Sequence, residues 1–210
     1  MIFTAKFKIF TVIIEKIGAL MNQWHHHHHF SYNEEERRRN QNPEKILLEA
    51  GLKEGMVFAD IGCNDGFFSI PASRIVGKNG KVIANDVNDE ALESLRQKFI
   101  NEGFSSYEII VGPAENLKLE ANSIDFIFFG IVLHDFNNPL KVLDISKSAL
   151  TDNGIVYDFD WRKDSQKNGP PTNIRLSIED VKNMSETQGL KVLSSKNLDE
   201  NFYQVIISKN

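Results

Sequence analysis

The sequence predicts a doubly wound α/β fold, with a mostly parallel sheet of seven strands and an antiparallel last strand. Short apolar runs alternate along the chain with stretches of helical periodicity, which is the pattern of parallel strands joined by right-handed helical crossovers. A glycine-bearing loop at residues 60–67 follows the first of these runs and opens the first crossover helix. Ligands bind at this edge in sheets of such topology.

Each strand of the predicted sheet corresponds to one apolar run. The strands are expected at residues 57–61, 81–85, 107–111, 124–129 and 154–157, and two more within 191–208 are close enough to pair antiparallel. The helices between them are expected at residues 67–76, 88–101, 139–150 and 178–188, with Pro71 bending the first. No repeat and no second-domain boundary interrupts this order.

The chain ahead of this alternation divides into two parts. Residues 1–29 are predicted to be a poorly ordered N-terminal extension, and residues 30–210 to be one domain that begins with helices. The acids and arginines of residues 33–39 predict a solvent-exposed helix, and a second helix is expected within residues 42–51. The His25–His29 run holds no ligand at a fixed geometry, so no metal site is predicted there.

Composition and charge limit the classes of function. The 210 residues, 41% of them hydrophobic and 25% charged, suit one globular domain, and the formal net charge of -5 argues against a nucleic-acid partner. The single cysteine, Cys63, excludes an intrachain disulfide and agrees with a cytoplasmic location. No apolar stretch is long enough for a membrane helix, so no membrane span is predicted.

The loop at residues 60–67 carries the chemical information. Glycines let the backbone turn sharply and approach a ligand, and the helix N-terminus behind them offers free N–H groups to an anion. A dinucleotide loop would need glycine at the positions of Asn64 and Phe67, and a phosphate loop would need a Gly-Lys pair that is absent. A carboxylate fits better than a pyrophosphate, and the methionine end of S-adenosylmethionine carries one.

Two further loops add to this interpretation. Asp86 ends the second predicted strand about twenty residues after the loop, the spacing of an acid that binds ribose hydroxyls. Residues 112–116 follow the third strand, where backbone groups are available to an adenine ring. Each of these segments is also compatible with an ordinary capped loop, so the combination is what favours a nucleoside cofactor.

Together these segments resemble the class I S-adenosylmethionine-dependent methyltransferases over residues 55–208. The segments in common are 59–63, 82–86 and 112–117. Within that family the chain is most similar to the ubiquinone/menaquinone-biosynthesis-type group, through residues 122–125 before the fourth strand and 133–136 after it.

The resemblance implies a Rossmann-like methyltransferase fold, S-adenosylmethionine as cofactor and a set of cofactor-binding residues. That set is Asp60, Gly62, Cys63, Asn64, Gly66, Asp86, Val87, Ala114, Glu115 and Gly130. Two positions depart from the family pattern. Asn64 replaces a glycine but tolerates left-handed backbone, and Pro113 replaces an acid that helps to hold the adenine amine.

Methyl transfer needs little from the protein beyond alignment of the acceptor with the carbon–sulfur bond of the cofactor, because the sulfonium already activates the methyl group. His134 is the candidate base, since it follows the fourth strand and its pKa range suits proton removal; a structural histidine bonded to the backbone is the alternative. Trp161 and Tyr203 are expected in the acceptor pocket or the core, and Asp160 and Arg162 as solvated loop charges.

The expected activity is methyl transfer to a small organic acceptor. A protein side chain stays open as acceptor, whereas residues 129–132 lack the motif of nucleic-acid amine methyltransferases. Two other functions remain open on the sequence: a non-catalytic protein that binds S-adenosylmethionine, and a nicotinamide-dependent oxidoreductase. The missing loop glycines argue against the latter.

Overall fold

The computed structural model describes Arg37, residues 41–166 and residues 169–209, and its centre is one seven-stranded sheet. The strands are β1 (Val57–Ile61), β2 (Lys81–Asp86), β3 (Tyr107–Val111), β4 (Ile124–Gly130), β5 (Leu150–Trp161), β6 (Lys191–Asn197) and β7 (Phe202–Ser208). They lie in the order β3-β2-β1-β4-β5-β7-β6. Strands β1 to β5 pair in parallel, and β7 runs antiparallel to both β5 and β6, which confirms the predicted fold class.

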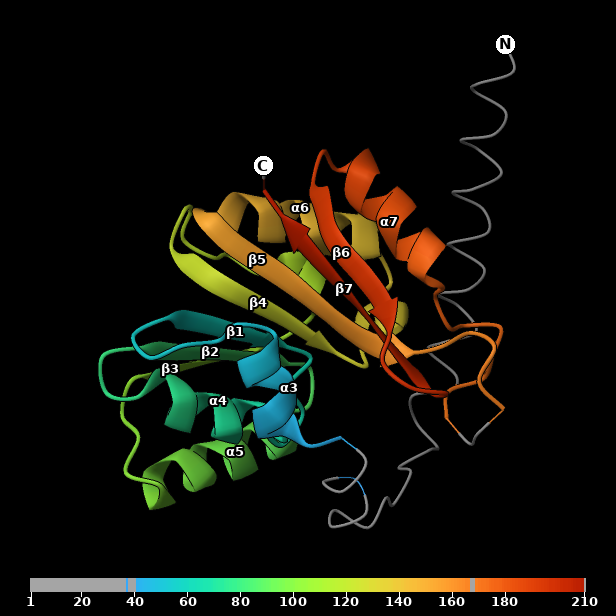
Figure 1. Ribbon diagram of the computed structural model, residues 1–210. Coiled ribbons are helices and arrows are strands. Elements are labelled where there is room, and N and C mark those ends of the chain that lie inside the picture. Colours follow the sequence, from blue (N-terminus) through green and yellow to red (C-terminus); the bar gives the residue numbers. More distant parts are fainter. Residues whose placement is uncertain (1–36, 38–40, 167–168, 210) are drawn as a thin grey trace.

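Helices cover both faces of the sheet (Figure 1). They are α3 (Pro43–Glu49), α4 (Ser69–Val76), α5 (Asp89–Asn101), α6 (Pro139–Ala149) and α7 (Ile178–Thr187), with short 3-10 turns η1 (Ala114–Asn116) and η2 (Leu133–Asp135). One hydrophobic cluster joins α3, α4 and α5 to the sheet, and a second joins α6 and α7 to the opposite face. The sheet is therefore apolar on both sides, as a doubly wound fold requires.

Several predicted boundaries differ from the observed ones. Strand β5 extends from Leu150 to Trp161, well beyond the predicted 154–157, and β7 pairs with it from Ile155 to Trp161. Helix α4 begins at Ser69 rather than at residue 67. Pro71 is its third residue, where a helix has no backbone hydrogen bond to lose, so the expected bend has no cause there.

The N-terminal predictions are only partly within the described residues. The second predicted helix is α3, which Asn42 caps by accepting a hydrogen bond from the Lys45 N–H at 3.0 Å. The extension at 1–29, its histidine run and the helix at 33–39 lie outside the described part of the chain, apart from Arg37. Within the described part, the helices are too short or too polar to span a bilayer.

Candidate functional site

The sequence-predicted residues gather at one edge of the sheet, beyond the carboxyl ends of the parallel strands. They come from four consecutive crossover loops, because the ends of parallel strands meet at the same edge. Asp60 lies near the end of β1, and the loop after β1 holds Gly62, Cys63, Asn64 and Gly66. Strand β2 ends at Asp86 with Val87 beside it, η1 holds Ala114 and Glu115, and β4 ends at Gly130, ahead of His134 in η2.

The loop between β1 and α4 makes a left-handed turn against the end of β2. The backbone φ angles are 76° at Gly62, 49° at Asn64 and 87° at Gly66, so Asn64 preserves the turn as predicted. The N–H groups of Gly62 and Cys63 both donate to the Asn85 carbonyl, at 2.7 and 2.9 Å. These bonds fix the loop to the neighbouring strand.

Gly62 also touches the other side of the site. A Cβ added at Gly62 would overlap Cγ2 of Val132, the residue that precedes η2. The turn after β4 is therefore packed directly on the loop after β1. A side chain at position 62 would have to separate the two.

Asp86 lies directly against this loop. Its Oδ2 accepts a hydrogen bond from the Asn64 N–H at 2.8 Å, and its Oδ1 accepts one from the Asn88 N–H at 2.9 Å. An ionised carboxylate has about four lone-pair sites, so two acceptor positions stay open for hydroxyl donors. Val87 beside it exposes 69% of its surface, which leaves an apolar face at the same edge.

Asp60, at the end of β1, is a buried carboxyl whose charge is poorly solvated. The Ser69 hydroxyl donates to its Oδ2 at 2.6 Å. Burial raises the pKa of Asp60 to about 7, the Ser69 hydrogen bond opposes this shift, the charge of Asp86 adds to it, and the charge of Arg37 opposes it. Asp60 therefore changes its charge near neutral pH.

Cys63 is chemically inert in this loop. The residue is 5% exposed, and burial together with the charges of Asp60 and Asp86 raises the pKa of its thiol far above the usual range. The thiolate is the nucleophilic form of cysteine, so Cys63 has no nucleophilic role here.

Asn85 is a site residue that the sequence interpretation missed. Its side chain is 1% exposed and donates to the carbonyls of Ile110 and Gly112, at 2.9 and 2.8 Å. Because the Asn85 carbonyl also accepts the bonds from Gly62 and Cys63, Asn85 joins the loop after β1 to the end of β3. The available signal was an amide inside an otherwise apolar strand, because a buried amide needs partners.

Glu115 has a structural partner at this edge. Its Oε1 accepts a hydrogen bond from the Asn138 N–H at 3.0 Å, and Asn138 is the N-cap of α6. Ala114 beside it is 4% exposed. The η1 turn is thus anchored to the helix that follows β4.

The chain leaves β4 through a strained residue. Ile131 has a φ of 61°, a left-handed conformation that a β-branched side chain rarely adopts. Its N–H donates to the Phe159 carbonyl of β5 at 2.7 Å. Gly130 before it lies against the rings of Phe68 and Phe128, where a Cβ would not fit. Such strain persists only where the surroundings enforce it, and it is frequent at functional sites.

His134 is the centre of a buried charge cluster. Its Nδ1 lies 2.7 Å from Oδ2 of Asp160 and its Nε2 lies 3.4 Å from Oδ1 of Asp135, while the side chains of His134 and Asp160 are each 1% exposed. Burial lowers the pKa of His134, but the charge and hydrogen bond of Asp160 and the charges of Asp135 and Asp158 outweigh it and raise the pKa to about 9. The imidazole is therefore a cation at neutral pH, bonded to a carboxylate rather than to the backbone.

The prediction that Asp160 is a solvated loop charge is wrong. Asp160 lies inside β5 and is 1% exposed, because β5 continues to Trp161 and its alternating side chains place Asp158 and Asp160 on the same inner face. Trp161 and Tyr203 are 6% and 1% exposed and belong to the two cores. Arg162 ion-pairs with Asp164 at 2.7 Å in the loop that follows.

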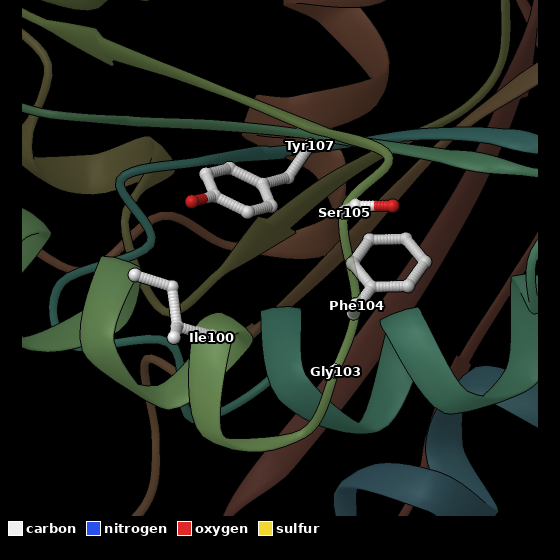
Figure 2. Close-up of a pocket in the computed structure, with 5 residues that line it drawn as sticks. All are labelled: Ile100, Gly103, Phe104, Ser105 and Tyr107. Carbon is white, nitrogen blue, oxygen red and sulfur yellow. The ribbon is translucent and has the colours of Figure 1, made fainter.

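A shallow pocket elsewhere on the molecule is separate from this site. It is lined by Ile100, Gly103, Phe104, Ser105 and Tyr107, and Figure 2 shows these residues between the end of α5 and the start of β3. These residues lie at the amino end of β3, the opposite edge of the sheet from the loops described above. The lining is mainly apolar, and the pocket contributes nothing to the site.

The model of a family described as a methyltransferase domain matches residues 52–206 of this chain. A demethylmenaquinone methyltransferase of Staphylococcus aureus (strain MRSA252) is 26% identical over 113 residues, which are 54% of this chain and 46% of that protein. The chain thus spans about half the length of the curated relatives it matches.

Two solved structures cover more of the chain. A SAM-dependent methyltransferase from Aquifex aeolicus superimposes with a TM-score of 0.75 at 28% identity and covers 86% of this chain and 100% of that one. A putative type 11 methyltransferase from Sulfolobus solfataricus superimposes with a TM-score of 0.66 at 26% identity, over 79% and 90% of the two chains.

Replacing Gly62 tests the contact between the two sides of the site. Gly62→Ala is expected to lower the free energy of unfolding by about 1–3 kcal/mol, because the new Cβ is strained by the left-handed backbone and overlaps Val132. Chemical denaturation measures this loss. Gly103→Ala is the matched control, since Gly103 has a φ of 68° and an added Cβ meets nothing within 4 Å. Equal losses in both variants would show that the Val132 contact is unimportant, and Gly62→Ala/Val132→Ala is expected to recover part of the difference.

The raised pKa of His134 predicts a pH-dependent stability. A histidine with a pKa of about 9 in the folded state and 6.5 when unfolded stabilises the fold fully below pH 6.5, and this contribution is lost as the pH rises through 9. His134→Asn keeps a neutral donor but no charge. The difference in unfolding free energy between wild type and variant is expected to shrink by roughly 3 kcal/mol at most between pH 6 and pH 9.5. A difference independent of pH would contradict a charged His134.

Proposed function

Because this chain belongs to the methyltransferase-domain family, we propose that it transfers the methyl group of S-adenosylmethionine to a small organic acceptor. The observation that carries this proposal is the junction of the left-handed loop with Asp86, whose carboxylate lies 2.8 Å from the Asn64 N–H. A carboxylate that could accept from ribose hydroxyls thus lies beside a turn that could receive an amino acid, which supports the proposal. The residues present therefore fit the cofactor.

Each side of the cofactor has a proposed partner at this edge. Gly62, Asn64 and Gly66 give the close backbone approach that the amino-acid end needs. Asp86 would accept from the ribose hydroxyls, and Val87 offers an apolar surface to the adenine ring. The other proposed cofactor residues from the sequence lie around these: Asp60 and Cys63 beneath the loop, Ala114 and Glu115 in η1, and Gly130 at the end of β4.

The bound cofactor supplies an activated methyl group on a sulfonium. The chain then has to hold the acceptor in line with the carbon–sulfur bond and to exclude water, and orientation of this kind contributes about 7–11 kcal/mol to such reactions. The acceptor site is expected beyond β4, beside Ile131 and η2, since Val132 there already touches the cofactor loop. Ile131, with its strained backbone, would form one side of this acceptor site.

His134 fits a positioning role better than that of a base. A general base must be unprotonated and must reach the proton it removes. His134 has a pKa of about 9 and a side chain that is 1% exposed, so it meets neither condition in the described structure. We propose that the His134–Asp160 pair fixes the η2 turn against β5.

The class of acceptor comes from the relatives rather than from the site. The name of the Staphylococcus aureus relative points to demethylmenaquinone, which makes a quinone or hydroquinone ring the first acceptor to test. A protein side chain is the second, whereas the net charge of -5 disfavours nucleic acid. A cytoplasmic location is proposed from the single, buried cysteine.

Transfer of a labelled methyl group tests the proposal. Purified protein with methyl-labelled S-adenosylmethionine is expected to label a small molecule in a cell extract or a demethylated quinol, detected by mass. Cofactor binding without transfer to any acceptor would favour the non-catalytic alternative. Binding of a nicotinamide dinucleotide in place of S-adenosylmethionine would overturn the proposal.

Asp86 gives a direct test of the ribose contact. Asp86→Ala is expected to weaken S-adenosylmethionine binding by about 1–3 kcal/mol, because ribose hydroxyls lose a charged acceptor. Isothermal titration calorimetry measures this change, and thermal denaturation reports how far the lost bonds to Asn64 and Asn88 disturb the fold. Asp89→Ala, an exposed acid three residues along, is the control. Unchanged affinity in Asp86→Ala would refute the assignment.

A pH–rate profile distinguishes a positioning role of His134 from a role as general base. In wild type, a positioning role of the charged His134 predicts that kcat falls as the pH rises through about 9, whereas a base predicts that kcat rises there, because only the neutral imidazole can accept a proton. In His134→Asn the corresponding ionisation is expected to disappear from the profile. Asp135→Asn is the control, since Asp135 lies 3.4 Å from the ring and Asp160 stays in place.

A further inference from the structure

Arg175 lies in the segment that connects β5 to α7, at the edge of the sheet where the acceptor site is proposed. The described residues of this β5–α7 segment are 162–166 and 169–177. Figure 1 shows the segment beyond the ends of β4 and β5. Gly130, the last residue of β4, pairs in register with Phe159 of β5, so the β5–α7 segment starts beside the turn that leaves β4.

The Arg175 guanidinium binds backbone carbonyls from both parts of this segment. Its Nη1 donates to the carbonyls of Arg162 and Ser165, each at 3.0 Å, and its Nε donates to the Pro170 carbonyl at 2.7 Å. Arg175 is 3% exposed. A charged group is expensive to bury without hydrogen bonds, and a guanidinium carries its donors in a rigid plane, so these bonds fix the course of the chain around Arg175.

Trp161 and Gly169 pack against the same guanidinium. The guanidinium carbon of Arg175 lies 5.4 Å from the centroid of the Trp161 ring. A Cβ added at Gly169 would come within 2.9 Å of that ring and within 3.2 Å of Nη2 of Arg175. A side chain at position 169 would therefore displace the ring or the guanidinium.

The connection between β6 and β7 holds the β5–α7 segment from the other side. The Arg162 N–H donates to the Asn201 carbonyl at 2.7 Å, and the Ser165 hydroxyl donates to Oδ1 of Asn201 at 3.0 Å. These are the same two residues whose carbonyls Arg175 binds. The start of the segment is thus fixed between Arg175 and Asn201.

We propose that Arg175 is a positioning residue for the methyl acceptor, because it holds the β5–α7 segment as one side of the acceptor site, next to the turn after β4. This inference rests on the proposed function and adds to it a residue that determines acceptor binding. Arg175 is buried, so it acts through the backbone that it holds. Loss of its bonds is expected to weaken acceptor binding, whereas the cofactor, proposed to bind at the ends of β1 and β2, keeps its affinity.

Steady-state kinetics and calorimetry with Arg175→Lys test this inference, because Lys keeps the charge but lacks the planar arrangement of donors. The KM for demethylmenaquinol, or for the acceptor that labelling with wild type identifies, is expected to rise by about 5- to 20-fold, while kcat and the Kd of S-adenosylmethionine change by less than about twofold. A merely structural role would lower the amount of folded protein, and with it the apparent kcat, without raising the KM. Arg96→Lys is the matched control, since Arg96 is exposed on α5 and pairs with Glu93 at 3.2 Å.

Hydrogen–deuterium exchange gives a second measurement, which needs no acceptor. In Arg175→Lys the amides of residues 162–166 are expected to exchange faster than in wild type, whereas those of the loop after β1 keep their rates. Gly169→Ala is a second variant that keeps the arginine and displaces it or the Trp161 ring with a single methyl group. It is expected to raise the KM for the acceptor in the same way.

The outcomes distinguish this inference from the proposed function. If wild type transfers a methyl group to no acceptor, the proposed function fails and the role of Arg175 fails with it. If wild type is active but the KM is unchanged in both variants, or if the Kd of S-adenosylmethionine rises as much as the KM, the inference is overturned while the proposed function stands. Unchanged exchange at residues 162–166 would also overturn it, and Gly169→Ala decides the outcome if Arg175→Lys does not fold.

Discussion

The site depends on one set of hydrogen bonds, those that hold the loop after β1 against the end of β2. The Asn85 carbonyl receives two backbone N–H groups of the loop, and the Asp86 carboxylate receives a third, from Asn64. These bonds need left-handed backbone at Gly62 and Asn64. Because a ligand has to meet the turn and Asp86 together, their mutual position is the condition for every contact proposed above.

The same turn also sets the position of the proposed acceptor side. Val132 packs on Gly62, and it follows Ile131, whose left-handed backbone is unfavourable for a β-branched residue by about 1–3 kcal/mol. The bond from Ile131 to Phe159 and the pair of His134 with Asp160 hold this segment to β5. These two interactions hold the strained segment in place against β5.

The sequence predicts the parts of this protein that depend on local patterns. Strand order along the chain, the loop at 60–67 and the position of Asp86 follow from periodicity, glycine spacing and the rule that parallel strands end at one edge. Strand β5 is longer than predicted because Asp160 looks like a loop residue in a linear sequence. Its burial depends on β7 and on His134, which lies 26 residues from it.

The residues that were missed from the sequence share a physical property. Each is polar, and its role depends on a partner that is distant in the sequence. Asn85 donates to carbonyls at the end of β3 and just after it, and Arg37 lies on Phe67, although the local pattern around Arg37 indicates only helical charge pairs. A charged or amide side chain is expensive to bury without such a partner. Once the fold brings these groups together, each pair fixes one loop relative to another, and this is the precision that orientation-dependent methyl transfer requires.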